Sequence, residues 1–216
     1  KLAFLSQAES TYFQNFNKQN IGFLSFFIES LDEQKILITD TKANFYIIKN
    51  YQNKKIDSKD YKKINNNLKT SKVLDTFIFE GNLFISYIKS KNGCKTFNIS
   101  YASFNNNYLN FKKFFENDQC GKWIQGGRIQ YFKHEEKKGI IFSLSDNIAD
   151  VPNNDPQDEN SFYGKTVFVN FDKTLNLIYS KGHRNMQGLF SDGNLILSTE
   201  HGPRGGDEIN KIEFNK

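Results

Sequence analysis

Several residue types are scarce in this 216-residue chain, and their scarcity excludes some classes of protein. The chain contains two Cys, three Pro, one Met and one Trp. No apolar run approaches the roughly 18 residues that a membrane-spanning helix needs, so a helical membrane protein is excluded. Apolar clusters recur from end to end, which excludes a disordered chain. Because it begins at Lys1 and shows no charged-then-apolar signal stretch, we expect it to be a piece of a longer protein.

Arginine is also scarce, which weakens the meaning of the basic charge balance. Lys and Arg number 29 against 24 acidic residues, for a net charge of +5, but only three of the 29 are Arg. The lysines are scattered along the chain, without the one-face clustering or the stacking platform of a nucleic-acid reader. We therefore expect no nucleic-acid partner. The three arginines, Arg128, Arg184 and Arg204, each fall in a Gly-rich segment.

Aromatic residues are abundant, with 22 Phe and 10 Tyr, and such rings favour strands. The apolar residues form short runs, several of which alternate with polar residues as strands do. Between two such runs, Asp192-Gly193 predicts a hairpin over residues 189–197. Many short strands separated by turns predict an all-β sandwich, barrel or propeller. The expected strands cover residues 21–29, 35–39, 45–49, 73–79, 83–88, 97–104, 109–115, 128–132, 140–144, 166–171, 175–179, 195–199 and 209–214.

Two segments depart from the strand pattern. Residues 53–71 are rich in Lys and Asn and predict an exposed surface insertion with at most one short helix. Residues 146–160 carry two prolines and five acids and predict a long loop. These acids lack the alternate spacing of a helix-flanked calcium loop, so a solvated acidic loop is expected there. No linker composition divides the chain, and we expect residues 1–216 to form one domain.

The two cysteines, Cys94 and Cys120, flank the expected strands at 97–104 and 109–115. If these strands pair as a hairpin, both thiols reach the same end and can form a disulfide. Such a bond would stabilise the fold by roughly 3 kcal/mol in the chain-entropy model. A disulfide would imply an oxidising compartment, whereas two separate buried thiols would fit a cytosolic protein. The sequence leaves both alternatives open.

The three Gly-rich segments carry groups that suit a ligand. They read Gly-Gly-Arg at 126–128, Gly-His-Arg-Asn-Met-Gln-Gly at 182–188, and Glu-His-Gly-Pro-Arg-Gly-Gly-Asp-Glu at 200–208. Glycine lets the backbone approach a ligand closely and adopt positive φ. Free carbonyl oxygens suit Ca²⁺, and an Arg-Asn pair offers planar donors to an anionic or quinone oxygen. Each segment taken singly could be a structural turn.

In their joint order, these segments resemble the glucose/sorbosone dehydrogenase family, the soluble quinoprotein aldose dehydrogenases that use pyrroloquinoline quinone (PQQ). The resemblance extends to Ser145-Asp146 and to the Gln-Asp…Gly-Lys pattern of residues 157–165, while Met186 stands where the family has Pro. It implies an all-β, six-bladed β-propeller. A propeller removes its open edges only by closing the ring. The expected strands make an incomplete set of about four blades, so residues 1–216 would form a partial propeller.

The resemblance also implies a site. In the family, Ca²⁺ polarises a quinone oxygen of PQQ while a His base takes the proton from the C1 hydroxyl of the sugar. By match to the family's motifs, Arg184 and Asn185 would contact PQQ. Gly202 and Pro203 would also face the cofactor, and their main-chain oxygens would ligate the calcium ion. Asp146 would stand where the family has the acid that orients the base.

One departure from the family concerns that base. The family's His lies four or five residues before the Arg of Gly-Gly-Arg, where this chain has Ile124 and Trp123. Neither can accept a proton, and a positioned general base typically contributes roughly 10² to 10⁴ in rate. His134 is a poor substitute on a polar stretch, and His201 has no assigned role as a base. His183 could be a packed core imidazole.

On this resemblance we expect an exported enzyme, periplasmic or secreted, that oxidises an aldose sugar at C1 to the lactone. PQQ and calcium would be its cofactors, and the electrons would pass to an acceptor that the sequence does not identify. The alternative is a catalytically impaired propeller that acts as a ligand- or protein-binding module. An unrelated propeller hydrolase is not expected, because the chain lacks a visible Ser/His/Asp set.

Overall fold

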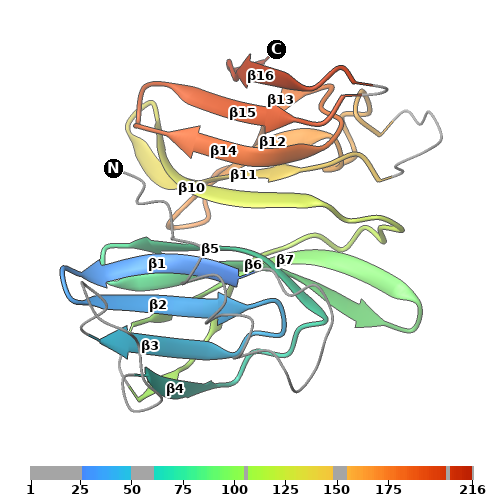
Figure 1. Cartoon of the computed structure of the whole chain (residues 1–216). Helices are drawn as coiled ribbons and strands as arrows, with labels where there is room; N and C mark the ends of the chain where they lie inside the picture. The colour runs from blue at the N-terminus through green and yellow to red at the C-terminus, as the bar shows by residue number, and fades with distance from the viewer. Residues whose placement is uncertain (1–25, 50–60, 105–106, 148–154, 203–204, 216) are drawn as a thin grey trace.

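The computed structural model describes residues 26–49, 61–104, 107–147, 155–202 and 205–215. Within these ranges the chain forms sixteen strands and no helix, so the all-β class predicted from the sequence is confirmed. None of the described segments therefore provides a helix long and apolar enough to cross a membrane. The strands make four sheets, which the chain begins one after another from the N-terminus to the C-terminus (Figure 1).

The first two sheets occupy the lower half of Figure 1. Neighbouring strands in them are antiparallel, except that β4 and β8 run parallel. The first sheet joins, in order, β1 (Phe26–Asp32), β2 (Lys35–Asp40), β3 (Phe45–Lys49), β4 (Tyr61–Asn66) and β8 (Tyr108–Leu109). The second joins β5 (Lys72–Phe79), β6 (Asn82–Lys91), β7 (Cys94–Ser103) and β9 (Lys112–Glu116).

The third and fourth sheets occupy the upper half of Figure 1 and are antiparallel throughout. The third joins β10 (Gly126–His134), β11 (Lys137–Leu144), β12 (Lys165–Asn170) and β13 (Asn176–Lys181). The fourth joins β14 (Met186–Ser191), β15 (Ile196–Glu200) and β16 (Glu208–Lys211). The first strands of successive sheets contact one another, β1 with β5, β5 with β10, and β10 with β14. This arrangement is consistent with a β-propeller family.

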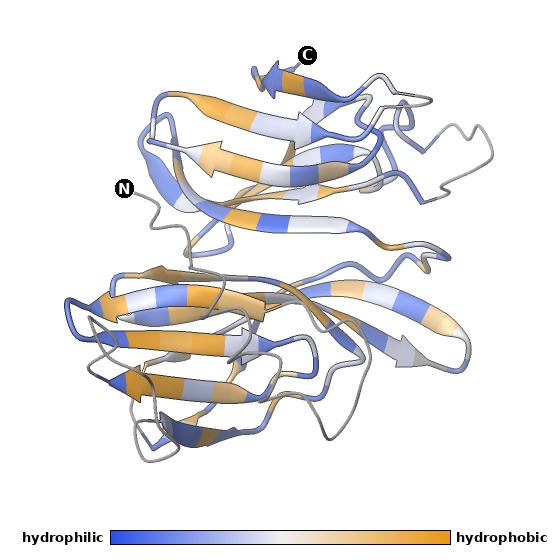
Figure 2. Cartoon of the chain, viewed as in Figure 1, coloured by the Kyte–Doolittle hydropathy of each residue, from blue (hydrophilic) through white to orange (hydrophobic). Residues whose placement is uncertain are grey.

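Apolar side chains fill the three spaces between neighbouring sheets. Apolar residues, orange in Figure 2, occur on strands of every sheet. Phe45 is fully buried in the cluster between the first and second sheets. Phe97 and Phe142 stack between the second and third, with ring centroids 5.4 Å apart. Ile196 belongs to the cluster between the third and fourth. Burial of this apolar surface is the main driving force for packing the sheets together.

The structure adds a strand to one segment, divides a predicted strand in a second and confirms a predicted hairpin in a third. Residues 61–66, inside the predicted surface insertion, form β4 and no helix, because Ile64 is fully buried in the first core cluster; residues 53–60 lie outside the described ranges. The run at 109–115 predicts a single strand but is divided between β8 and β9. The predicted hairpin over 189–197 is confirmed as β14 and β15, whose turn includes Gly193 at a φ of +97°.

A disulfide joins Cys94, at the start of β7, to Cys120, beyond the end of β9, with the two Cα atoms 5.2 Å apart. The predicted hairpin forms, because β7 and β9 pair antiparallel with Asn98 opposite Glu116. Gly121 N–H also donates to Lys95 O (2.8 Å) and holds the two ends of the bridged loop together. Of the two alternatives that the sequence left open, the structure has the disulfide.

Candidate functional site

Four of the predicted site residues, contributed by three separate segments, come together. The loop after β11 reaches the segment before β14, where Asp146 N–H donates to Arg184 O (2.7 Å). The segment after β15 reaches the same place, where His201 N–H donates to Asn185 O (3.0 Å). Arg184 Nη1 donates to the carbonyl oxygen of Gly202 (3.1 Å). Asp146, Arg184, Asn185 and Gly202, to which the family resemblance gives roles, therefore lie close together in the fold.

Two successive main-chain oxygens point at the guanidinium of Arg184. Nη1 donates to His201 O (2.8 Å) as well as to Gly202 O, and the Arg184 side chain is half-buried between the segments. The carbonyl groups therefore already face a cation. Pro203, the other residue predicted to bind the cofactor and calcium, lies outside the described residues.

Asn185 lies beside Arg184 and has its amide oriented by a neighbour on β14. Gln187 Nε2 donates to Asn185 Oδ1 (2.6 Å). Since the amide oxygen is occupied in this way, the two N–H groups of Asn185 Nδ2 remain to serve a ligand. No described residue accepts a hydrogen bond from them. Arg184 and Asn185 together offer planar, directional donors.

His183, in contrast, is a buried structural imidazole with both ring nitrogens engaged. Its Nδ1 donates to Glu200 Oε1 (2.8 Å), and its Nε2 lies 2.7 Å from Ser180 Oγ. Ser180 Oγ in turn lies 2.6 Å from Thr166 Oγ1 on β12. The ring is only 9% exposed, so the alternative of a packed core imidazole is confirmed.

Glu200 joins the Gly-rich segments to one another, a role that the sequence reasoning missed. Its carboxylate accepts from the His183 ring, from Arg184 N–H (2.8 Å) and from Asn210 Nδ2 on β16 (3.3 Å). Burial alone would raise the pKa of Glu200, but these hydrogen bonds and the His183 charge hold it below its ordinary value of 4.5. The carboxylate fixes the backbone from which the Arg184 and Asn185 side chains project.

Asp146 is half-buried and carries an altered acidity. Burial raises the pKa of its carboxyl to about 6; the charge of Arg184 lowers it, and the nearby carboxylates of Asp155 and Glu200 raise it further. A carboxyl with this pKa is closer to the ordinary range of a general base than a solvated Asp is. The position therefore suits proton chemistry.

The segment that includes the two positions expected for the base, 123 and 124, is hydrogen-bonded to both chain neighbours of Asp146. Gln125 N–H donates to Ser145 Oγ (3.0 Å), and Lys122 N–H donates to Asn147 Oδ1 (2.7 Å). Between these anchors, Ile124 is buried in the core cluster of the second and third sheets, and Trp123 is 52% exposed. Residues 122–125 therefore lie beside the loop that carries Asp146, and Trp123 and Ile124, at the positions expected for the base, have no group that accepts a proton.

Neither of the other histidines replaces that base by position. His134 ends β10, at the opposite end of the strand from Gly126, and its ring packs against Phe168, Tyr179 and Phe214. His201 lies in the site segment, where its Nδ1 is 3.4 Å from Asp207 Oδ2 and its side chain is exposed.

Lys165 is a second residue of note that the sequence reasoning left without a role. Its side chain is fully buried, and its Nζ donates to Tyr163 O (3.0 Å) and to Asp155 O. Burial lowers the pKa of Lys165 to about 8, against the opposing charges of Asp155 and Asp158. The lysine ties the loop beside Asp146 to β12. Its sequence signal was its place in the Gln-Asp…Gly-Lys pattern of residues 157–165, just before the expected strand at 166–171.

Side chains alone do not make a calcium site in the described part of the chain. Residues 26–49, 61–104, 107–147, 155–202 and 205–215 contain no group of three or more His, Cys, Asp or Glu side chains placed to hold a metal ion. The family resemblance implies main-chain oxygens as calcium ligands, and one of them, Gly202 O, accepts from Arg184 Nη1 in this structure.

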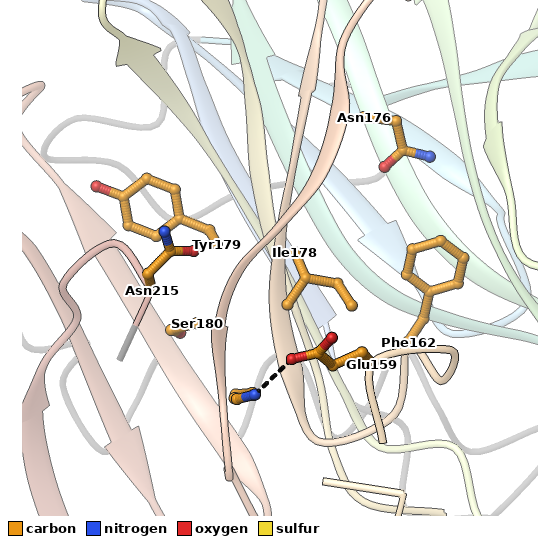
Figure 3. A pocket seen from close by; sticks show the side chains of 8 residues that line it. Glu159, Phe162, Asn176, Ile178, Tyr179, Ser180 and Asn215 are labelled. Atoms are coloured by element: carbon orange, nitrogen blue, oxygen red, sulfur yellow. Dashed lines mark hydrogen bonds and ion pairs between the residues drawn. The ribbon is translucent and has the colours of Figure 1, made fainter. Parts of the chain in front are cut away.

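Two cavities lie near these elements, and only one adjoins the site. A cavity of about 620 Å³ runs along β13, where Figure 3 shows Glu159, Phe162 and Tyr179 on its wall. Its two charges, Glu159 and Lys181, neutralise each other at 2.9 Å, and none of the four converging residues lines it. A cavity of about 270 Å³ is lined by residues that contact the site. They include Gln187, Glu200, His201 and Asp207.

The fold and the site define an all-β protein of several packed sheets whose Gly-rich segments hold an Arg-Asn pair against main-chain oxygens. A family model, "Glucose / Sorbosone dehydrogenase", matches residues 25–216. The chain therefore belongs to the glucose/sorbosone dehydrogenase family, and this membership suggests sugar dehydrogenase activity in general. An uncharacterized protein of Synechocystis sp. is 41% identical over 61 residues, which make up 27% of this chain and 15% of that protein.

Proposed function

We propose that this chain forms part of a PQQ-dependent dehydrogenase that oxidises an aldose at C1 to the lactone. The observation that supports this most directly is the convergence of the Arg184 and Asn185 donors with the carbonyl oxygen of Gly202. Guanidinium and amide donors match the carboxylate and quinone oxygens of PQQ. Membership of the family supports the same class of reaction.

The donor set fits the two cofactors through different groups. Arg184 and Asn185 supply positive charge and N–H donors, which suit an anionic, oxygen-rich ring system. Hard oxygen ligands suit Ca²⁺, and two neighbouring carbonyl groups, of His201 and Gly202, already face a cation. Gly202 O could serve calcium once Arg184 Nη1 turned from that oxygen to the cofactor.

Each residue of the site has a separate task in this proposal. When bound, PQQ would supply the acceptor for the hydride of the sugar's C1. Arg184 and Asn185 would bind and orient it, and Glu200 would hold both through the Arg184 N–H and the His183 ring. Asp146 would orient a proton acceptor at the C1 hydroxyl; the acceptor itself is not identified among the described side chains.

A binding module that retains the cofactor site without turnover is the second candidate. One observation favours it: positions 123 and 124, which pack against the Asp146 loop, hold Trp and Ile. Loss of a positioned base lowers a rate by roughly 10² to 10⁴ without removing any binding group. This candidate predicts cofactor binding with little or no sugar oxidation.

The four sheets would be blades of a closed six-bladed ring in the full-length protein. Large apolar side chains are exposed in the two terminal sheets: Ile28 at 47%, Phe190 at 52% and Ile209 at 76%. Exposed faces and open edges of this kind are covered when a propeller closes its ring. Every test of function should therefore use the full-length protein.

The disulfide bears on where the protein works. Structural disulfides persist in oxidising compartments, so the Cys94–Cys120 bond supports a periplasmic or secreted location. Thiol labelling of the protein from its native source, before and after reduction, measures this. Labelling of both cysteines only after reduction is expected, and labelling without reduction would contradict an exported location.

Titration of the full-length protein with PQQ, with and without CaCl₂, tests the proposed activity. Binding is followed by the absorbance of the cofactor, and turnover by reduction of a dye acceptor with a panel of aldoses. Binding with dye reduction supports the dehydrogenase, whereas binding without reduction supports the module. Absence of binding would contradict the roles given to Arg184 and Gly202.

A matched pair of variants locates the binding site. Arg184→Ala removes a charged donor and should weaken PQQ affinity by roughly 10- to 100-fold, as expected for a charged hydrogen bond. Lys181→Ala removes a cation three residues away that pairs with Glu159, outside the converging groups, and should leave affinity unchanged. Equal losses in both variants would indicate a nonspecific effect of charge.

A further inference from the structure

Three neighbouring strands, β5, β10 and β14, carry β-bulges where they contact one another. A bulge leaves its extra residue out of the strand ladder and re-aims the side chains beside it. Leu74 on β5 and Gln187 on β14 are such skipped residues, and Arg128 lies in the bulge of β10 between them. The interrupted registers are Val73/Asp75, Gly126/Ile129 and Met186/Gly188.

The guanidinium of Arg128 bridges the two flanking strands. Its Nε donates to Gln187 O (2.6 Å), and its Nη1 donates to Leu74 O (3.1 Å). Nη1 also lies 3.4 Å from Asp75 Oδ1. One side chain therefore satisfies two carbonyl groups that the bulges remove from strand pairing. The planar fork holds its donors at fixed, separate positions, whereas the ammonium group of a lysine is one point on a flexible stem.

The two glycines before Arg128 permit this close approach. Gly126 and Gly127 have φ of +71° and +74°, a conformation that side-chain-bearing residues rarely adopt. A Cβ added to Gly126 would lie 2.9 Å from Met186 O on β14, and one added to Gly127 would lie 2.6 Å from Leu74 Cδ1 on β5. The Gly-Gly-Arg motif thus places a guanidinium between two strands that nearly touch β10.

Gln187 connects this bridge to the candidate site. Its main-chain oxygen is held by Arg128, and its side-chain amide donates to Asn185 Oδ1 (2.6 Å). We propose that Arg128 is a positioning residue, which fixes Gln187 and through it presents the Asn185 Nδ2 donors to PQQ. This role rests on the proposed function, in which Asn185 contacts the cofactor.

Another hydrogen bond to the same bulge provides the control. Ser86 Oγ, on β6, donates to Gly127 O and is fully buried, and no hydrogen bond between described residues joins it to Gln187. Ser86→Ala therefore loosens the bulge without breaking the path to Asn185. A merely structural Arg128 should behave as Ser86 does.

PQQ affinity of the full-length variants measures the first consequence. Arg128→Lys should weaken binding by about 10-fold, the change that accompanies loss of one or two neutral-acceptor hydrogen bonds. Ser86→Ala should change affinity by less than about 2-fold. If Arg128→Lys does not fold, Gln187→Ala removes the last contact of the path and should give a comparable loss. Equal effects of Arg128→Lys and Ser86→Ala would contradict the role of Arg128.

A double-mutant cycle tests whether the effect passes through Asn185. In an Asn185→Ala background, Arg128→Lys should cause little further loss of PQQ affinity, because the group that it positions is absent. Losses that simply add would show that Arg128 acts on the site by another route.

Crystal structures of the cofactor-free full-length protein decide the inference separately from the proposed function. In Arg128→Lys, Asn185 should lose its contact with Gln187 or adopt another rotamer, whereas in Ser86→Ala it should keep both. Failure of the wild-type protein to bind PQQ would overturn the proposed function alone. An unchanged Asn185 in Arg128→Lys would overturn the positioning role, whatever the cofactor.

Discussion

The two Gly-rich segments near the C-terminus each pair a histidine with a carboxylate, and the two pairs differ in their surroundings. His183 lies 2.8 Å from Glu200, and the side chains of both are nearly buried. His201 lies 3.4 Å from Asp207, and these side chains are 59% and 67% exposed. Both pairs occur in the motifs that mark the family, but among the described residues only the first has partners for both ring nitrogens.

The difference shows that burial determines whether a histidine–carboxylate pair is held in one arrangement or exchanges partners. A buried carboxylate that accepts three hydrogen bonds holds its partners in one arrangement, because breaking any of them leaves a polar group without water. An exposed pair competes with water and salt, so it can exchange partners at little cost. We therefore infer that the His183–Glu200 pair supports the site, whereas the His201–Asp207 pair can exchange its hydrogen-bond partners.

The largest effect should follow from removing the buried carboxylate. Glu200→Ala leaves the His183 ring and the Arg184 N–H unpaired in a buried place and should destabilise the protein by about 3–5 kcal/mol. Chemical denaturation of the full-length protein measures this. The matched variant Asp207→Ala should lose less than about 0.5 kcal/mol, because its pair is exposed. Similar losses in both variants would remove the distinction between the pairs.

A third histidine–carboxylate pair can be created near Asp146 by substitution. Trp123→His places an imidazole in the segment that packs against Asp146, and any weak sugar oxidation should rise at least about 10-fold. Lys122→His, one residue away, is the control and should leave the dye-reduction rate unchanged. An unchanged rate in Trp123→His would count against this placement of the missing base, provided the variant still binds PQQ.

Asp146 should show an intermediate effect with a distinctive pH dependence. Its pKa is raised to about 6 from an ordinary 3.8, so the folded protein holds this proton more tightly than the unfolded chain does. Its contribution to stability therefore falls as pH rises from about 4 to about 6. Asp146→Asn should raise the free energy of unfolding at pH 7 by up to about 1 kcal/mol, allowing for solvent screening, and by little at pH 4.

Thermal denaturation of the Asp146→Asn protein at both pH values measures this dependence. The exposed Asp118→Asn also removes one negative charge and is the control for the change in net charge. A gain at pH 4 equal to that at pH 7 would contradict the acidity assigned to Asp146.

The smallest effect should come from the exposed ring. His201→Ala removes a side chain whose only described partner is the carboxylate 3.4 Å away and should change the free energy of unfolding by less than about 0.5 kcal/mol. His183→Ala is the matched comparison and should be clearly more destabilising, because its ring is buried. A melting temperature that falls as far in His201→Ala as in His183→Ala would show that exposure does not separate the two.

Local patterns in the sequence account for most of the strands. β3 occupies residues 45–49 as expected, and the Asp192-Gly193 turn forms the predicted hairpin. These features depend on neighbouring residues, whose alternation and turn chemistry act over a few positions. β4 escaped prediction because its Lys- and Asn-rich sequence hides a single buried residue, Ile64. Only its pairing with β3 makes that segment a strand.

The candidate site was predicted in part, through its motifs. Arg184, Asn185 and Gly202 were found because Gly-rich segments with an Arg are conspicuous, and the structure brings them together. Glu200 was part of a matched motif but carried no expected task. Its three hydrogen bonds come from His183, Arg184 and Asn210, which are 10 to 17 positions away. Nothing in a linear pattern shows that one carboxylate serves all three.

By itself, the sequence determined the strand class, the turns and the places where glycine frees the backbone, because these depend on the intrinsic preferences of residues and their near neighbours. Only the tertiary structure decided which histidine is buried and hydrogen-bonded and which is exposed. It also decided which carbonyl groups accept hydrogen bonds from a guanidinium. Arg128 and Gln187 are 59 positions apart and meet at 2.6 Å because two bulged strands from different sheets lie side by side. Burial and hydrogen bonding between such distant residues arise only when the sheets pack.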